Sequence, residues 1–303
     1  MKRFLSAALA AFLALAILGC AKPEGLTAIV PSGSPALAQI YVQTDGRHAV
    51  SVVNGADPLV AAFGSGSHDV VFAPTNLGAK MIAAGADYRF AAAVVWGNYY
   101  LVTTGKTSFT LDGLDGASIL AFGQNQTSDI VLRHLLSEND VDATLTYVDA
   151  VASAAALFAA DPTLVVLTAE PSLSALCATV DGLQVIDLQD EYAALHGEGS
   201  YPQAGVFVMN GIDADRVDAY LTDLAASVSA VNDDPAAAAA AGAELGFGFS
   251  EAVMTGAIPG SHLAYVAAAD ARTALEAYFA IILEMNPALI GGTLPGEGFY
   301  LER

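Results

Sequence analysis

The chain has 303 residues, of which 32 are acidic and 11 are Lys or Arg, so its formal net charge at pH 7 is −21. A charge of this sign repels nucleic acid and anionic lipid, which excludes proteins that bind either through a basic face. Hydrophobic residues make up 54% of the chain, which opposes disorder, and the length suffices for two modest domains or one large one.

Residues 1–19 have the pattern of an export signal. Lys2 and Arg3 precede an uncharged apolar stretch, 4–18, that is shorter than the ~20 residues a membrane-spanning helix needs. The stretch ends in ILGC, which resembles a bacterial lipobox with Ile17 in place of the more usual Leu. This resemblance implies that Cys20 becomes the lipidated first residue; the alternative is an ordinary secretory signal with an incidental cysteine. We expect a protein of the bacterial cell envelope, in the periplasm or lipid-anchored on the outer side of the cytoplasmic membrane.

Short β-branched strands alternate with helices in the segment 20–104, which we predict to be the first part of lobe 1. Strands are expected at 26–30, 49–53 and 69–73, and each is followed by a run of helical pattern. This alternation indicates a parallel sheet covered on both faces. The apolar runs 90–95 and 99–104 follow, with only three residues between them, which predicts a bend or a hairpin.

The same alternation restarts in the segment 105–204, which we predict to be lobe 2. Strands are expected at 118–122, 143–148, 163–167 and 184–188, and helices at 127–137, 151–160 and 171–180. The strand 205–209 begins the return to lobe 1 (205–303), where Asp213 is a plausible N-cap, Pro235 starts another helix and 269–285 has the most regular helical period. From Asp213 nearly to the end, the pattern predicts helices.

These elements predict an α/β fold with two lobes, each a parallel or mixed sheet flanked by helices, and a ligand cleft between them. Rotation at the connections 103–113 and 199–206 would close the cleft. Ligands of parallel α/β sheets lie beyond the carboxyl ends of the strands, where helix N-termini present unpaired N–H groups. The residues at these junctions that we predict to contact a ligand are Ser32, Gly33, Ser34, Thr75, Asn76, Gln126, Thr127, Ser128 and Glu170.

Some of these junction residues have a simpler alternative role. Thr75 caps its helix, or does so in addition to binding, and Thr127 or Ser128 caps the next lobe's helix, to which Asp129 lends a favourable charge. Glu170 is either a carboxylate in the cleft or a solvated acid in the first turn of a helix.

The bend after the run 90–95 and the turn at 201–205 add further candidates: Trp96, Asn98, Tyr99, Tyr201 and Gln203. The aromatic rings offer flat faces, each stack contributing about 0.5–1.5 kcal/mol beyond burial, although each ring has core packing as its alternative. The amides and hydroxyls offer neutral hydrogen bonds, and only Glu170 adds a charge, which suits a cationic or amino group. We therefore expect a small, neutral or amino-substituted heteroaromatic ligand.

No catalytic set is visible, and we predict a protein that is not an enzyme and uses no metal or cofactor. The five histidines are scattered without an HExxH pattern, and GSGSH at 64–68 fails the GxSxG spacing of a nucleophile elbow. Lipidation of Cys20 leaves Cys177 without a disulfide partner, and no basic residue stands near it. We expect Cys177 to be a small buried hydrophobic residue.

Four segments resemble one known family in the expected order: DVVFAPTNLGAKM (69–81), WGNYYLV (96–102), TAEP (168–171) and YPQAGVFVM (201–209). The family is the type II periplasmic substrate-binding proteins of ABC importers, and the likeness is greatest to the branch of thiamine-pyrimidine-precursor and aliphatic-sulfonate binders. The resemblance implies the family's fold, and a monomer that delivers a small molecule to an ABC permease. The chain departs from sulfonate binders because Lys80 and Arg133 lie inside predicted helices, away from the cleft. An enzyme of pyrimidine or dehydratase chemistry on the same fold, and a surface sensor lipoprotein, remain as alternatives.

Overall fold

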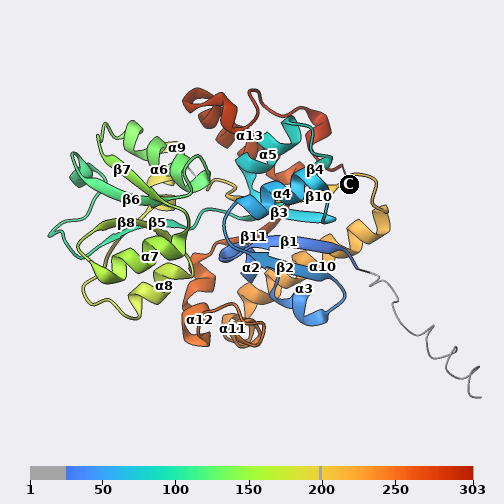
Figure 1. Ribbon diagram of the computed structural model, residues 1–303, viewed down its shortest axis with the longest axis horizontal. Helices are drawn as coiled ribbons and strands as arrows, with labels where there is room; N and C mark the ends of the chain where they lie inside the picture. The colour runs from blue at the N-terminus through green and yellow to red at the C-terminus, as the bar shows by residue number, and fades with distance from the viewer. Residues whose placement is uncertain (1–24, 198–199, 303) are drawn as a thin grey trace, which may run out of the picture.

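The computed structural model describes residues 25–197 and 200–302, which form two lobes that lie side by side (Figure 1). The predicted export signal and Cys20 lie outside these residues. No helix in the described part of the chain has the length and hydropathy needed to cross a membrane.

The first lobe is built on a six-stranded mixed sheet with the order β11-β4-β10-β3-β1-β2. Strands β2, β1 and β3 are parallel, whereas β10 runs antiparallel to both β3 and β4. The central strands β3 and β10 are apolar along their whole length, as expected where helices cover both faces of a sheet. The strands are β1 (Thr27–Pro31), β2 (Ala49–Val53), β3 (Val70–Pro74), β4 (Tyr88–Val95), β10 (Ala204–Met209) and β11 (Leu263–Ala267).

Each face of this sheet has its own hydrophobic core. Phe90 and Phe207 centre the core under α4, α5 and α13, whereas Phe72 and Tyr220 belong to the core under α2, α3, α10, α11 and α12. The helices are α2 (Ser34–Leu37), α3 (Ile40–Asp45), α4 (Asp57–Ser65), α5 (Thr75–Ala83), α10 (Ala214–Asp233), α11 (Pro235–Glu244), α12 (Glu251–Gly260) and α13 (Ala268–Met285), with short 3₁₀ turns η2 (Pro287–Leu289) and η3 (Glu297–Phe299) near the end.

Two predicted helix starts in this lobe are confirmed. The Asp213 carboxylate accepts a hydrogen bond from the Arg216 N–H, as an N-cap does, and Pro235 begins α11 behind the capping Asp234.

The second lobe is a five-stranded mixed sheet with the order β7-β6-β8-β5-β9. Helices α6 and α9 lie on one face of this sheet and α7 and α8 on the other (Figure 1). Its elements are β5 (Tyr99–Thr103), η1 (Asp112–Leu114), β6 (Ser118–Phe122), α6 (Thr127–Glu138), β7 (Thr144–Val148), α7 (Val151–Ala160), β8 (Val165–Ala169), α8 (Ser172–Cys177), β9 (Gln184–Asp187) and α9 (Leu188–His196).

The strand at 99–103 lies in the second lobe, and so its predicted place in the first lobe was wrong. It pairs with β8 and β9, whereas β4 pairs with β10 and β11, so 96–98 is a crossing between the lobes and not a hairpin. Gly97 has a φ of 76°, and an added Cβ there would lie 2.7 Å from Gln189 and from Ser200, which explains glycine at this crossing. The chain returns to the first sheet after α9 through a second crossing, which includes 200–203 and leads directly into β10. The predicted hinge at 103–113 therefore lies inside the second lobe.

Two smaller predictions were also wrong, and one helix was missed. Strand β11 lies in a region predicted to be helical; its five residues sit between two helices and pair only with β4, so they are too few to interrupt the helical pattern. Helix α9 was not predicted. Only three of its nine residues are buried, Leu188, Gln189 and Tyr192, so it has little apolar pattern. Cys177 ends α8 with an exposed side chain, because α8 turns its other face to the sheet.

Candidate functional site

A cavity of about 200 Å³ lies between the lobes at the carboxyl ends of six strands. Three of them, β1, β2 and β3, are parallel in the first sheet, and β6, β7 and β8 are parallel in the second. Residues directly after each strand, or its last residue, border the cavity, together with residues from the two crossings. This is the place where parallel α/β sheets bind their ligands.

Nine of the predicted site residues border this cavity, drawn together from both lobes and both crossings: Ser32, Gly33, Ser34, Asn98, Tyr99, Gln126, Ser128, Glu170 and Gln203. Five others do not border it: Thr75, Asn76, Trp96, Thr127 and Tyr201.

Thr75 is fully buried, and it hydrogen-bonds the end of β3 to the residues just before β10. Its hydroxyl donates to the carbonyl of Pro202 at 2.7 Å, and its N–H donates to the carbonyl of Gln203. Both predicted roles, ligand contact and helix cap, are therefore wrong for its side chain, because the main chain of the second crossing occupies its hydroxyl. Asn76 and Thr127 are buried as well, and they hydrogen-bond to each other across the two lobes at 3.3 Å.

Two of the three predicted aromatic contacts are packing residues. The Trp96 indole N–H donates to the carbonyl of Ala264, away from the cavity. Tyr201 is fully buried, stacks on Tyr99 with ring centroids 6.2 Å apart, and donates its hydroxyl to Gln189 Oε1. Tyr99 borders the cavity, and no described residue hydrogen-bonds its hydroxyl. Burial raises the pKa of Tyr99 far above its ordinary value, so this hydroxyl stays protonated as a donor.

An amide network joins the two crossings at the cavity. The Asn98 N–H donates to Gln203 Oε1 at 2.9 Å, and Gln203 Nε2 donates back to Asn98 Oδ1 at 2.7 Å. The Asn98 amide also donates to Ser34 Oγ, which lies 2.9 Å from Ser261 Oγ. Each of these side chains is at least nine-tenths buried, so the bonds satisfy groups that water does not reach freely.

Glu170 borders the cavity, but its carboxylate serves the start of α8. The carboxylate accepts from both the N–H and the hydroxyl of Ser174 at 3.0 Å, whereas the main-chain carbonyl of Glu170 lies 3.3 Å from Ser34 Oγ. Burial raises the pKa of the Glu170 carboxyl, and the bonds from Ser174 offset part of that rise. The carboxylate is thus an acid at a helix start, as in the alternative reading, but a buried rather than a solvated one.

Helices α4, α6 and α7 begin at the cavity without a capping side chain. Their N-cap residues, Ala56, Gln126 and Ala150, all border the cavity, and none accepts a hydrogen bond from the first turn through its side chain. The predicted caps of α6 are wrong, because the Ser128 hydroxyl donates to the carbonyl of Phe122 instead. The positive ends of three helix dipoles therefore converge on this space, and α6 and α7 supply most of the free N–H groups, because the second residue of α4 is Pro58, which has no N–H. By contrast, α9, α10, α11 and α12 each begin with an Asp or Ser cap.

The residues that follow β2 and β7 were not among the predicted site residues. Asn54, Gly55 and Ala56 border the cavity after β2, and 149–151 border it after β7. The rule that found Ser34 and Gln126 also applies to them, because Asn54 and Asp149 are polar residues directly after a parallel strand.

Comparison with solved structures bears on this arrangement. An ABC transporter protein from Parabacteroides distasonis is 22% identical, with a TM-score of 0.80 over 92% of this chain and 99% of that one. The periplasmic aliphatic sulphonate binding protein SsuA from Escherichia coli is 16% identical, with a TM-score of 0.71 over 93% and 95% of the two chains. The alkanesulfonate-binding protein SsuA from Xanthomonas axonopodis pv. citri, bound to MOPS, is 19% identical, with a TM-score of 0.65 over 91% and 96%. No family model and no curated protein matches the sequence.

The chain has the periplasmic binding protein fold. The predicted fold class, two mixed sheets flanked by helices, is confirmed. Since none of these three identities exceeds 22%, the likeness establishes the fold and leaves the ligand to be argued from the cavity.

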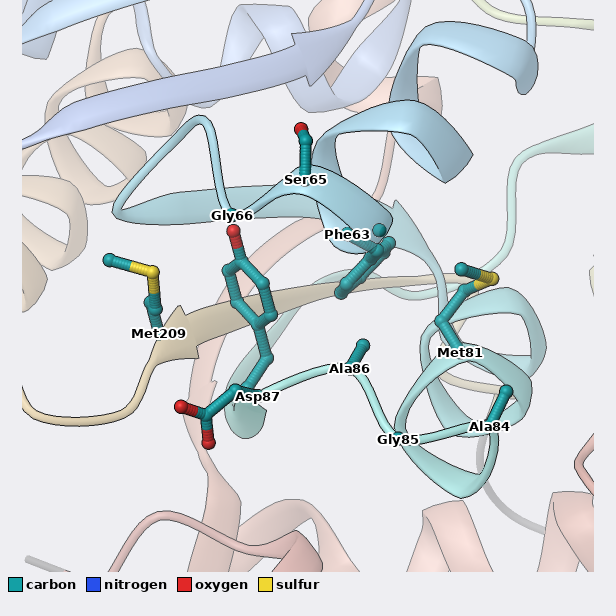
Figure 2. Close-up of a pocket in the computed structure, with 11 residues that line it drawn as sticks. Phe63, Ser65, Gly66, Met81, Ala84, Gly85, Ala86, Asp87 and Met209 are labelled. Atoms are coloured by element: carbon teal, nitrogen blue, oxygen red, sulfur yellow. The ribbon is translucent and has the colours of Figure 1, made fainter.

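A second hollow of this periplasmic binding protein fold, about 520 Å³ in volume, lies within the first lobe (Figure 2). Figure 2 shows Gly66 and Met209 on one side of it and Met81 and Ala84 on the other. This hollow lies where β3 and β4 begin, at the opposite end of the sheet from the strand-to-helix junctions described above. The buried hydroxyl of Tyr88, which borders it, already donates to the carbonyl of His68 at 2.6 Å. The cavity between the lobes is therefore the candidate site. No group of three His, Cys, Asp or Glu side chains in the described residues is arranged to hold a metal ion.

Proposed function

We propose that this protein is an extracytoplasmic solute-binding lipoprotein, anchored through Cys20, that captures a small organic molecule between its lobes and delivers it to an ABC permease. One observation carries the proposal: the carboxyl ends of six parallel strands from two sheets border one cavity. It is supported by structural neighbours described as an ABC transporter protein and as sulphonate-binding proteins.

The residues around the cavity indicate the class of solute. A volume of about 200 Å³ is below the roughly 300–1,000 Å³ of pockets for drug-sized ligands, so the solute is small. Tyr99 and Phe122 supply flat apolar surface, and no Lys, Arg or His borders the cavity in the described part of the chain. The free N–H groups of α6 and α7 suit hydrogen-bond acceptors of the solute. The exposed carboxylate of Asp149 suits an amino group, because its pKa is lowered by the hydrogen bond from Ser153 and it is ionised at neutral pH.

A small heteroaromatic compound, neutral or amino-substituted, satisfies all these groups at once: its ring nitrogens or carbonyls accept from the helix N-termini and its amino group lies near Asp149. A sulfonate is the second candidate, because two neighbours are described as binding sulphonates. Because no described Lys, Arg or His borders the cavity, the negative charge of a bound sulfonate would be compensated by main-chain N–H groups alone. The lobes would close over the solute by rotation at 96–98 and at the residues before β10. Micromolar affinity, about −8 kcal/mol, suffices for capture and still permits release to a permease.

Equilibrium dialysis against pyrimidines, alkanesulfonates and amino acids tests the solute class, and the substitution Ala150→Asp tests the site. An aspartate at this N-cap of α7 would occupy the free N–H groups and add a negative charge, so we expect weaker uptake together with higher stability by about 0.5–2 kcal/mol.

Ala267→Asp is the matched control, because it adds the same cap and charge to α13, which begins without a side-chain cap and away from the cavity. Uptake should be unchanged in this control. Equal effects of the two substitutions on uptake, or uptake of no compound in the panel, would contradict the proposal.

A further inference from the structure

Asn76 lies in the first turn of α5 in the first lobe, yet its side chain bonds to the second lobe. It is 2% exposed. Its Nδ2 donates to the carbonyl of Asn125 at 3.1 Å, and its Oδ1 accepts from the Thr127 hydroxyl at 3.3 Å. The second Nδ2 proton faces the carbonyl of Leu289 in the first lobe at 3.4 Å. Both amide protons and the amide oxygen of Asn76 are therefore engaged without a contact to the cavity.

The second lobe presents Asn125 to Asn76 in a fixed orientation. Asn125 has a left-handed backbone with a φ of 63°, and its N–H donates to the buried carboxylate of Asp129 at 2.7 Å. Asp129 is itself fixed, since it accepts from Arg133 at 2.9 Å and from the Tyr147 hydroxyl at 2.6 Å. The carbonyl that Asn76 binds is thus an anchored feature of α6 and β7.

The same loop carries part of the candidate site. Gly123, Gln126 and Ser128 border the cavity, and they flank the two residues, Asn125 and Thr127, that Asn76 binds. A contact that holds this loop against α5 therefore also sets the distance between the two walls of the cavity.

We infer that Asn76 is a positioning residue that holds the two lobes together in the absence of solute. The inference deepens the proposed function, since it identifies what biases the closure that a solute binder requires. When the lobes separate, water replaces the partners of Asn76, so its bonds favour the closed form by only the small net amount typical of an exchanged hydrogen bond. Removal of the amide should lower the ratio of closed to open protein by about tenfold.

Small-angle X-ray scattering of the solute-free mature chain measures this ratio through the radius of gyration. We expect a closed wild type, an expanded Asn76→Ala variant, and a similar expansion for Thr127→Val, which removes the partner hydroxyl from the other lobe while keeping its shape. Asn210→Ala is the control, because Asn210 donates a hydrogen bond from its side-chain amide to Asp87 at 2.7 Å, and both residues belong to the first lobe. Its scattering should match that of the wild type.

An open wild type without solute, or an Asn76→Ala variant with wild-type scattering, overturns the inference. If Asn76→Ala does not fold, the scattering of Thr127→Val decides alone. No solute enters this measurement, so a failure of the dialysis panel would count against the proposed function and leave the scattering result intact.

Discussion

Substitution of Asn98 by alanine should destabilise the protein strongly, even though the residue lies on a three-residue connection. Asn98 is 1% exposed, and its side chain bonds to Gln203 Nε2 and to Ser34 Oγ. Each such bond is worth about 0.5–1.5 kcal/mol net, and a buried amide left without a partner costs about 1–3 kcal/mol. Since Gln203 is 7% exposed and would lose the acceptor of its Nε2, we expect the free energy of unfolding to fall by about 2–4 kcal/mol.

Urea unfolding followed by circular dichroism measures this loss, and thermal unfolding should show Tm lowered by roughly 5–15 °C. Asn210→Ala is again the matched control, because its bond to Asp87 is exposed and its loss should stay within about 0.5 kcal/mol. An Asn98→Ala variant within about 0.5 kcal/mol of the wild type would refute the argument that the two crossings are fixed by this buried network.

Two further predictions concern packing and pH. Gly78→Ala should lose about 1–3 kcal/mol despite the helix preference of alanine, because the new Cβ would lie 2.0 Å from Phe207 Cζ; Gly64→Ala, where nothing lies within 4 Å, should gain up to about 1 kcal/mol in the same urea assay. Equal effects of the two substitutions would show that the ring of Phe207 moves freely. Burial raises the pKa of the Glu170 carboxyl in the folded state. Between the unfolded and the folded pKa, the folded protein therefore keeps a proton that the unfolded chain has released. Stability falls as the pH rises through that range. Glu170→Gln removes this loss, so its stability relative to the wild type should increase as the pH rises above 4.5, and a difference that does not change with pH would contradict the assignment.

Local pattern was sufficient for most elements of the fold and insufficient for their assembly. Strand β2 and helix α7 have the predicted bounds, because a short β-branched run and an alanine-rich helical run are each recognisable alone. The partner of a strand is not a local property. Apart from Arg89, strands β4 and β5 are both buried, and both are mostly apolar, so nothing in their composition tells which sheet each one joins. The error in the lobe boundary and in the predicted hinge follows from that one ambiguity.

The candidate site shows the same limit at the level of side chains. The rule that polar residues after a parallel strand face the ligand correctly predicted that Ser34 and Gln126 border the cavity. Applied to every strand, the rule would also have predicted Asn54 and Asp149. It could not separate a group that faces the cavity from one that faces the other lobe. Thr75 and Asn76 stand at such a junction, and their partners, a main-chain carbonyl and a loop of the second sheet, are set by how the lobes meet.

The crossing at 96–98 also carries the only tryptophan of the chain. Its indole N–H donates to the carbonyl of Ala264 in β11, and its main-chain N–H donates to the carbonyl of His262 just before β11. Trp96 is thus fixed to β11 where the backbone passes from one sheet to the other. We expect a rotation of one lobe against the other to change the polarity around that indole. The protein therefore contains a built-in fluorophore at its pivot, and its emission wavelength should follow opening and closing in solution without any attached dye.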